Sequence, residues 1–166
     1  GVLEKMDAHN RHGIIIVQPG FAVEPWFGDH ATDRQVRQAS YLREYVVPFV
    51  EKRFGVRPVP GNRLLLGYSK SGWGAFSLVL KYPDTFGYAA SWDAPLMFRR
   101  FHYGMKRVYG TRAQLDRFRP DLLARRQKRF FTDRCRLVLA GEKDWGTSIP
   151  APGGGSHTAA FHALLD

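Results

Sequence analysis

The chain has a single cysteine, Cys135, among its 166 residues. One thiol cannot form an internal disulfide, and cysteine and histidine do not cluster at the spacing of metal ligands. The sequence therefore predicts neither a disulfide-bonded secreted scaffold nor a zinc site. Long apolar runs are also lacking: residues 14–17 and 64–66 are far too short to cross a bilayer. We expect a protein without membrane contact, located in the cytoplasm unless preceding residues direct its export.

Acidic residues are scarce, with 15 Asp and Glu against 25 Lys and Arg. The imbalance lies in residues 99–136, which contain thirteen basic and three acidic residues. This difference accounts for the whole net charge of +10. The remainder of the chain is neutral. Hydrophobic residues make up 44% of the sequence, which excludes a disordered protein, and the length fits one domain with its own core.

Residues 64–68 form an apolar, strand-like run that leads directly into a turn of small residues and then into a helical pattern. The small residues of this turn are Gly67, Ser69, Ser71, Gly72 and Gly74. A sharp strand-to-helix turn leaves no room for bulky neighbours and presents the hydroxyl at its apex, Ser69, above the sheet. This pattern is typical of a nucleophilic serine, although Ser71 stands where the G-x-S-x-G motif has its second glycine.

A turn of this composition can also connect a strand to a helix without any chemical role, or hold a phosphate on its backbone amides. The glycines do not follow the G-x-G-x-x-G spacing of a dinucleotide-binding loop. Lys70 and Ser71 follow Ser69 rather than the spaced glycine of a P-loop. A nucleophile is therefore the favoured interpretation of Ser69.

The hydrophobic pattern predicts alternating strands and helices. Strands are expected at residues 14–17, 63–68, 87–92 and 136–140, and helices at residues 2–12, 33–54, 73–82, 112–118, 122–131 and His157–Leu165. Pro48 is expected to kink the long helix. The alternation indicates an α/β fold with a mainly parallel sheet, in which ligands bind beyond the carboxyl ends of the strands. Ser69, Asp93 and Asp144 each follow the end of an expected strand.

Two stretches carry a family resemblance: residues 67–75, Gly-Tyr-Ser-Lys-Ser-Gly-Trp-Gly-Ala, and residues 82–86, Tyr-Pro-Asp-Thr-Phe. They resemble the α/β-hydrolase superfamily and, within it, the esterase branch that includes esterase D-like, feruloyl-esterase-like and mycolyltransferase-like enzymes. The likeness is close over residues 63–95 and architectural elsewhere. It implies that residues 1–166 form one domain in which helices flank the sheet. The basic segment then takes the place of a helical cap, at about residues 97–134, with aromatic side chains that form an acyl-binding wall.

In this family the catalytic residues follow the chain order serine, acid, histidine, so the resemblance implies roles for residues after the strand ends. Ser69 becomes the nucleophile, and Asp144, on the loop after the strand at residues 136–140, becomes the acid that orients the histidine. Asp93 is the alternative acid. The backbone N–H of Lys70 becomes one of the two donors that hold the oxyanion.

His157 follows Asp144 in the expected order and stands at the start of the last predicted helix. A histidine beyond residue 166 fits the family pattern as well, because the catalytic histidine there normally follows a further strand. The remaining candidates are His30, His102 and His162. Substrate contacts are expected from three aromatic residues near the strand ends: Tyr68, Trp26 and Trp145.

The resemblance also implies that the chain is part of a longer protein. In the family, the strand that precedes the oxyanion loop lies in the sheet between the two strands expected at residues 14–17 and 63–68. Neither that strand nor the family's last strand has a counterpart in this sequence. We therefore expect residues 1–166 alone to be poorly folded or inactive.

Together these patterns predict a serine hydrolase that cleaves the carboxylic ester of a small molecule through an acyl-enzyme on Ser69. Such chemistry needs no metal and no organic cofactor. The alternative is a non-catalytic, hydrolase-like protein that uses residues 99–136 to bind an anionic partner or nucleic acid. Nucleic acid is the less favoured partner, because no RNA- or DNA-binding motif accompanies the charge. The arginine excess also fits a solvated surface with no specific role.

Overall fold

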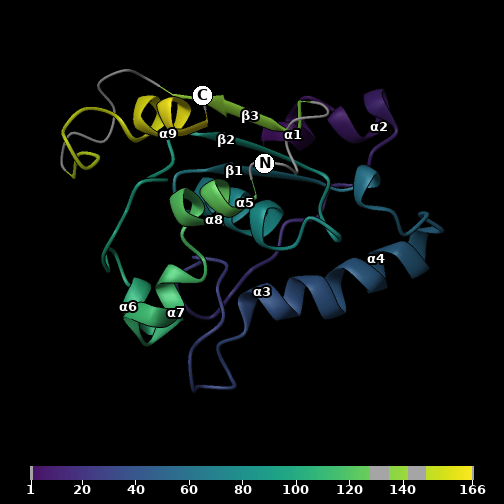
Figure 1. Ribbon diagram of the computed structural model, residues 1–166. Helices are drawn as coiled ribbons and strands as arrows, with labels where there is room; N and C mark the ends of the chain where they lie inside the picture. Colours follow the sequence, from purple (N-terminus) through teal and green to yellow (C-terminus); the bar gives the residue numbers. More distant parts are fainter. Residues whose placement is uncertain (1, 128–134, 142–148, 166) are drawn as a thin grey trace.

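The computed structural model describes residues 2–127, 135–141 and 149–165. Helices and strands alternate along the chain, as Figure 1 shows. The strands are β1 (Leu64–Tyr68), β2 (Tyr88–Trp92) and β3 (Leu137–Ala140). The helical segments are α1 (Val2–Lys5), α2 (Ala8–His12), α3 (Gln38–Tyr41), η1 (Leu42–Val46), α4 (Val47–Phe54), η2 (Pro60–Asn62), α5 (Lys70–Lys81), α6 (Met105–Tyr109), α7 (Arg112–Asp116), α8 (Pro120–Arg126) and α9 (His157–Leu165).

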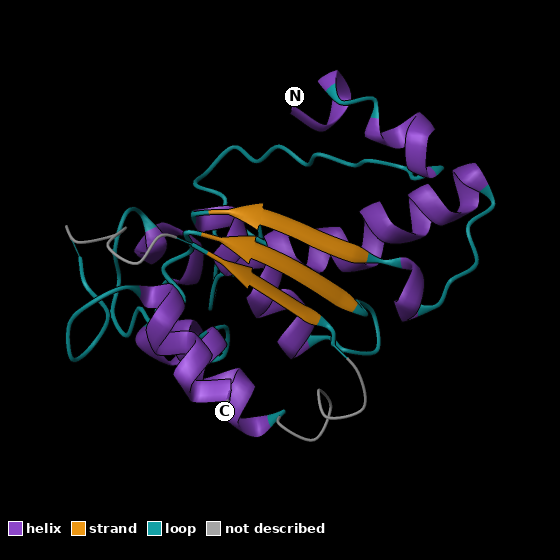
Figure 2. Ribbon diagram, turned by 90° about the horizontal axis from the view of Figure 1, so that it is seen from above, coloured by secondary structure: helices purple, strands orange, loops and turns teal. Residues whose placement is uncertain are grey.

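The three strands form one parallel sheet in the order β1–β2–β3. Leu64 of β1 pairs with Tyr88 of β2, and Ala89 of β2 pairs with Leu137 of β3. All three strands therefore end at the same edge, and in Figure 2 the arrows point in one direction. The predicted α/β class, a parallel sheet flanked by helices, is confirmed.

One face of the sheet packs against α5, in which residues 72–80 are all buried. A helix buried on every side needs neighbours besides the sheet. α8 packs against α5, and Figure 1 shows both helices below the sheet. Phe161 of α9 meets Phe76 of α5 edge-on, with 5.5 Å between the ring centroids. The hydrophobic core therefore surrounds the helix that begins at Ser69.

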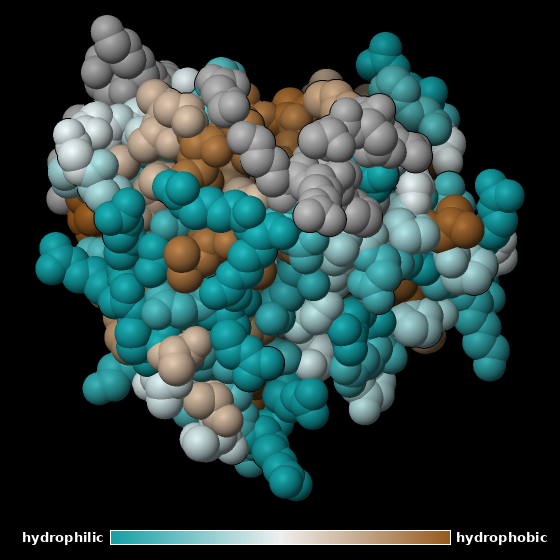
Figure 3. Space-filling model, viewed as in Figure 1, coloured by the Kyte–Doolittle hydropathy of each residue, from teal (hydrophilic) through white to brown (hydrophobic). Residues whose placement is uncertain are grey.

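The opposite face of the sheet is open. Figure 2 looks down on it and shows the three strands with no described helix lying over them. On β1, the side chains of Leu64, Leu66 and Tyr68 point to this face and are 63%, 45% and 47% exposed. Trp92 and Val138 are exposed on the neighbouring strands. Figure 3 accordingly shows apolar surface at the top of the molecule, where Figure 1 places β2 and β3.

Residues 14–17, predicted as a buried strand, lie outside the sheet. They run alongside β1 in Figure 2 without pairing with it, and their side chains are 40% to 47% exposed. The prediction is wrong because an apolar run becomes a strand only where a neighbour supplies backbone hydrogen bonds. No strand in the described part of the chain supplies them here.

Residues 33–54, expected as one helix, form the continuous series α3, η1 and α4, which begins at Gln38. Pro48 lies in the first turn of α4. Since proline lacks an N–H, the normal bonding of the helix is interrupted there. The preceding η1 is a π-helical turn in which the Val47 N–H bonds to the Leu42 carbonyl. The irregularity expected at Pro48 therefore takes the form of a π turn.

The basic segment contributes α6, α7 and α8 in the described residues. α6 was absent from the sequence prediction because five residues are too few to show a helical period. It is bounded by Gly104 and Gly110, whose φ angles of 81° and 72° favour glycine. Met105, Val108 and Tyr109 of α6 are buried in the core. That this segment also covers Ser69 as a cap stays a prediction.

Candidate active site

Ser69 stands between the end of β1 and the first turn of α5. Its φ of 53° and ψ of −119° lie in a region that residues other than glycine rarely adopt. The Ser69 N–H donates to the Trp92 carbonyl at 3.1 Å, and the Ser69 carbonyl accepts from the Trp73 N–H at 3.1 Å. Such a strained backbone persists only where its surroundings enforce it. The sharp strand-to-helix elbow predicted from the sequence is therefore present.

Two glycines of the elbow leave no space for a side chain. A methyl group on Gly67 would overlap the carbonyl carbon and oxygen of Ser71. A methyl group on Gly72 would overlap the Ser91 hydroxyl and lie 2.7 Å from Cβ of Ala94. These close approaches bring β1, β2 and α5 together beneath Ser69, and they explain why the turn consists of small residues.

Lys70 is the first residue of α5. The first N–H groups of a helix have no partner within it, and they lie at the positive end of the helix dipole. The Lys70 N–H thus has the character expected of an oxyanion donor. The Lys70 ammonium lies over the ring of Trp26, 5.7 Å from its centroid.

Trp26 is fully buried, and its indole N–H donates to the Tyr103 carbonyl at 2.8 Å. Its ring meets that of Trp73 edge-on, with 5.9 Å between centroids. The hydroxyl of Tyr109 accepts from the indole N–H of Trp73 and donates to the Trp26 carbonyl. Trp26 therefore supports the first turn of α5 from within the core. The Trp26 side chain has no exposed surface, and its expected substrate contact stays a prediction.

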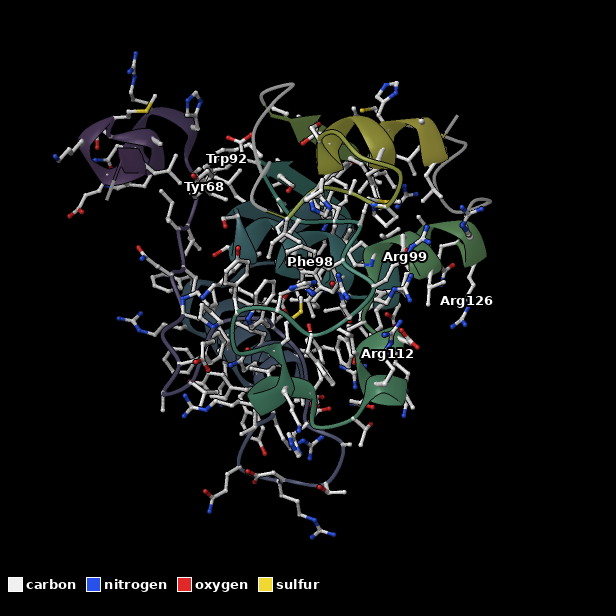
Figure 4. All side chains as sticks on the ribbon, turned by 90° about the vertical axis from the view of Figure 1, so that its left-hand side faces the viewer. Tyr68, Trp92, Phe98, Arg99, Arg112 and Arg126 are labelled. Carbon is white, nitrogen blue, oxygen red and sulfur yellow. The ribbon has the colours of Figure 1, made fainter. Side chains whose placement is uncertain are left out.

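Tyr68 is exposed, but its ring pairs with that of Trp92 at 5.8 Å on the open face of the sheet. Figure 4, which faces the edge where the strands end, shows these two rings side by side and away from Phe98. Tyr68 thus lies beside the elbow rather than above it. Asp144 and Trp145 fall outside the described residues, so their roles stay predictions.

Asp93, the alternative acid, directly follows β2 at the same edge as Ser69. Its φ is 47°, and its N–H donates to the Ala140 carbonyl at 3.1 Å. The Ser69 N–H bonds to the residue that precedes Asp93. The backbone of Asp93 therefore lies next to the elbow on the adjacent strand, whereas its carboxyl oxygen Oδ1 lies close to Gly141, which follows β3.

His157 is buried, and both of its ring nitrogens meet backbone groups. Nδ1 accepts from the Met97 N–H at 3.1 Å, so this nitrogen carries no proton. Nε2 lies 2.9 Å from the Ile149 carbonyl, to which it must donate. Among the described contacts of His157, none reaches Ser69. In this arrangement His157 bonds to backbone groups, and its expected role as catalytic base stays a prediction.

The pKa of His157 is lowered, chiefly because burial disfavours the charged ring. The Ile149 carbonyl opposes this shift, and the nearby His102 adds to it. His157 is therefore a neutral side chain that joins α9 to the backbone of residues 97 and 149.

We expect His157 to make the protein less stable in mild acid. The unfolded chain takes up a proton near pH 6.5, whereas the folded chain keeps His157 neutral to lower pH. The unfolded state then binds more protons between the two pKa values, so the free energy of unfolding falls as the pH drops below about 6.5 and is fully retained above it. Urea unfolding at several pH values measures this slope.

His157→Phe should flatten that slope, whereas His162→Gln, an exposed change on the same helix, should preserve it. Equal slopes in the wild type and His157→Phe would contradict the assigned protonation state of His157.

The other candidate histidines occupy different places. Nδ1 of His30 accepts from the Asp33 N–H at 2.8 Å and shapes a turn. His162 is exposed on α9. The ring of His102 packs on Phe98, 4.2 Å between centroids, and burial together with the nearby Arg100 lowers the pKa of His102. Of these three histidines, His102 lies on the loop that follows β2, the strand that pairs with β1.

The aromatic residues of the basic segment are mostly core residues. Phe98, Tyr109 and Phe118 are buried, whereas Tyr103 is exposed. The three buried rings therefore offer no surface for the expected acyl-binding wall and cannot stack on nucleic-acid bases, whereas Phe101 is half-buried. Phe130 and Phe131 fall outside the described residues. Sequence composition could not distinguish buried from exposed aromatic residues, because it does not show which side chains pack into the core.

Within the described residues, no group of three or more His, Cys, Asp or Glu side chains gathers as metal ligands would. Nor has any described helix the length and apolar character required to span a membrane. An open hollow of about 510 Å³ lies between residues 21–23 and the α3–η1 helix. None of the predicted site residues lines this hollow.

Comparisons with known proteins agree with this architecture. A family model described as Putative esterase matches residues 9–141. No curated protein matches the chain in sequence. An S-formylglutathione hydrolase from Agrobacterium tumefaciens is 16% identical with a TM-score of 0.62, over 86% of this chain and 50% of that one. MPT51 from Mycobacterium tuberculosis is 16% identical with a TM-score of 0.60, over 84% and 55%. The chain spans about half the length of these two structures, and the likeness concerns the fold.

Proposed function

Because the chain belongs to the esterase family whose model it matches, we propose that it is a serine hydrolase, which cleaves a carboxylic ester through an acyl-enzyme on Ser69. The observation that supports this most is the strained backbone of Ser69, held from both sides at the strand-to-helix elbow. Backbone strain of this kind clusters at active sites, where it forms part of the mechanism.

In the proposed reaction the Ser69 hydroxyl attacks the ester carbonyl while a histidine takes its proton. The Lys70 N–H at the positive end of α5 holds the oxyanion that forms. The alcohol leaves with the proton of the histidine, and the acyl group stays on Ser69. Water then attacks the acyl-enzyme, releases the acid and restores the serine.

The base and its acid complete the proposal. His157 is held between two backbone groups, so we assign the base to a histidine outside residues 1–166, as the family resemblance allows. Asp144 is the proposed orienting acid, and Asp93, next to the elbow, is the alternative.

Reaction with a neutral fluorophosphonate tests the nucleophile in the protein that carries residues 1–166. The wild type should become labelled on the peptide that contains Ser69, and Ser69→Ala should not react. Ser71→Ala is the matched control, since it removes a hydroxyl from the same turn and should still be labelled. A folded wild type that resists the reagent, or a Ser69→Ala variant that reacts as well as the wild type, would refute the proposal.

A further inference from the structure

The loop after β2 is anchored against the elbow by buried residues. Ala94 lies close to Gly72 in the first turn of α5. The ring of Phe98 is buried 6.4 Å from those of both Trp26 and Trp73. These contacts fix where the chain emerges from the core, and it emerges at two exposed arginines, Arg99 and Arg100.

Arg99 and Arg100 take part in none of the ion pairs among the described residues. Three described arginines farther along the chain differ in this respect, because acids hold them: Arg107 pairs with Glu24, Arg112 with Asp116, and Arg119 with Asp121. The positive charges of Arg99 and Arg100 are therefore not offset by direct contacts. The charge of Arg100 acts on a neighbouring side chain, since it contributes to the lowered pKa of His102.

Figure 4, which faces the edge where the strands end, shows where the labelled arginines lie relative to Phe98. Arg99 is drawn at the level of Phe98, and Arg112 and Arg126 lie on the same side of the molecule. Lys70, whose ammonium rests on Trp26, adds a further cation at the start of α5. Two exposed cations thus follow directly on Phe98, the residue of the loop after β2 whose ring packs near Trp73 of α5.

We infer that the ester cleaved at Ser69 carries an anionic group, with carboxylate- or phosphate-type oxygens, that binds to Arg99 and Arg100. This inference rests on the proposed function. A guanidinium group presents paired N–H donors that match such oxygens in a bidentate manner. Uncompensated positive charge also speeds the encounter with an anionic substrate, and salt weakens this attraction.

Two pairs of esters test the inference, one pair for each side of the ester bond. 4-Nitrophenyl succinate and 4-nitrophenyl butyrate differ by a carboxylate on the acyl side. 3-Acetoxybenzoate and phenyl acetate differ by a carboxylate on the leaving side. In at least one pair, the ratio of the wild-type kcat/KM for the anionic ester to that for the neutral ester should be about ten or more. Raising the salt concentration to about 0.5 M should reduce this ratio.

The double variant Arg99→Gln, Arg100→Gln should bring the same ratio close to one. Arg57→Gln is the control, because Arg57 is an exposed arginine between α4 and β1, at the opposite end of the strand, and should preserve the ratio. A wild-type ratio near one in both pairs, or a ratio that survives the double variant, would overturn the inference.

Labelling of Ser69 by the neutral fluorophosphonate separates this result from the proposed function. If Ser69 is labelled and neither pair shows a preference, the anionic substrate is refuted while the hydrolase stands. If Ser69 is not labelled, the hydrolase itself is refuted and the inference falls with it.

Discussion

Replacing Gly67 with alanine is expected to lower the free energy of unfolding by about 3 kcal/mol or more and to abolish labelling of Ser69. The added methyl group would overlap the carbonyl carbon and oxygen of Ser71. These are backbone atoms in the first turn of α5, so they cannot move aside as a flexible side chain does. Relief of the overlap must separate β1 from α5, and this separation dismantles the turn that holds Ser69.

Gly61→Ala is the matched control for this prediction. A methyl group on Gly61 meets no atom within 4 Å, and this glycine is not among those with a positive φ. The same chemical change should therefore alter the free energy of unfolding by no more than about 0.5 kcal/mol. Urea unfolding of both variants measures the difference. If Gly67→Ala unfolds at the same urea concentration as Gly61→Ala, the close approach of β1 and α5 is not what holds the elbow.

The elbow could be predicted from the sequence because all of its determinants are neighbours in the chain. The apolar run of β1, the small residues around Ser69 and the helical pattern of α5 follow one another within residues 64–81. Each is a local preference, and they agree with one another. The same holds for β2 and β3, whose predicted bounds differ from the observed ones by one residue.

The role of His157 could not be predicted in the same way. Chain order suggests it as a catalytic base, but its partners are the backbone groups of Met97 and Ile149. Met97 is 60 residues away, and a backbone N–H carries no residue-type signal. The buried cluster of Trp26, Trp73 and Tyr109 was missed for the same reason, because it joins residues up to 83 positions apart.

The wrong strand at residues 14–17 shows a different limit. The sequence pattern there is correct for a buried strand, and the segment does run alongside β1. Strand formation, however, depends on a hydrogen-bonding neighbour, which the segment itself does not encode. The resemblance to the α/β-hydrolase superfamily places one more strand between residues 14–17 and β1. We propose that polypeptide outside residues 1–166 supplies it.

Residues 1–166 prepared alone are therefore expected to self-associate and to bind a hydrophobic dye through the open face of the sheet. Leu64, Leu66 and Tyr68 form a row of exposed apolar side chains on β1, which is an edge strand in the order β1–β2–β3. An exposed apolar edge of this kind favours pairing with other chains. Dye fluorescence and sedimentation as a function of protein concentration measure both effects.

Leu64→Lys together with Leu66→Lys should suppress dye binding and association without lowering the melting temperature, since both side chains already contact solvent. Leu65→Lys is the matched control: Leu65 lies between them but points to α5 and packs against the core. Burial of its unpaired ammonium should destabilise the fold by about 3 kcal/mol or more. If the Leu64, Leu66 double variant is destabilised as strongly as Leu65→Lys, the open face of the sheet is in fact covered by other parts of residues 1–166. If the wild type is monomeric and binds no dye, the open face does not mediate self-association and the prediction is wrong.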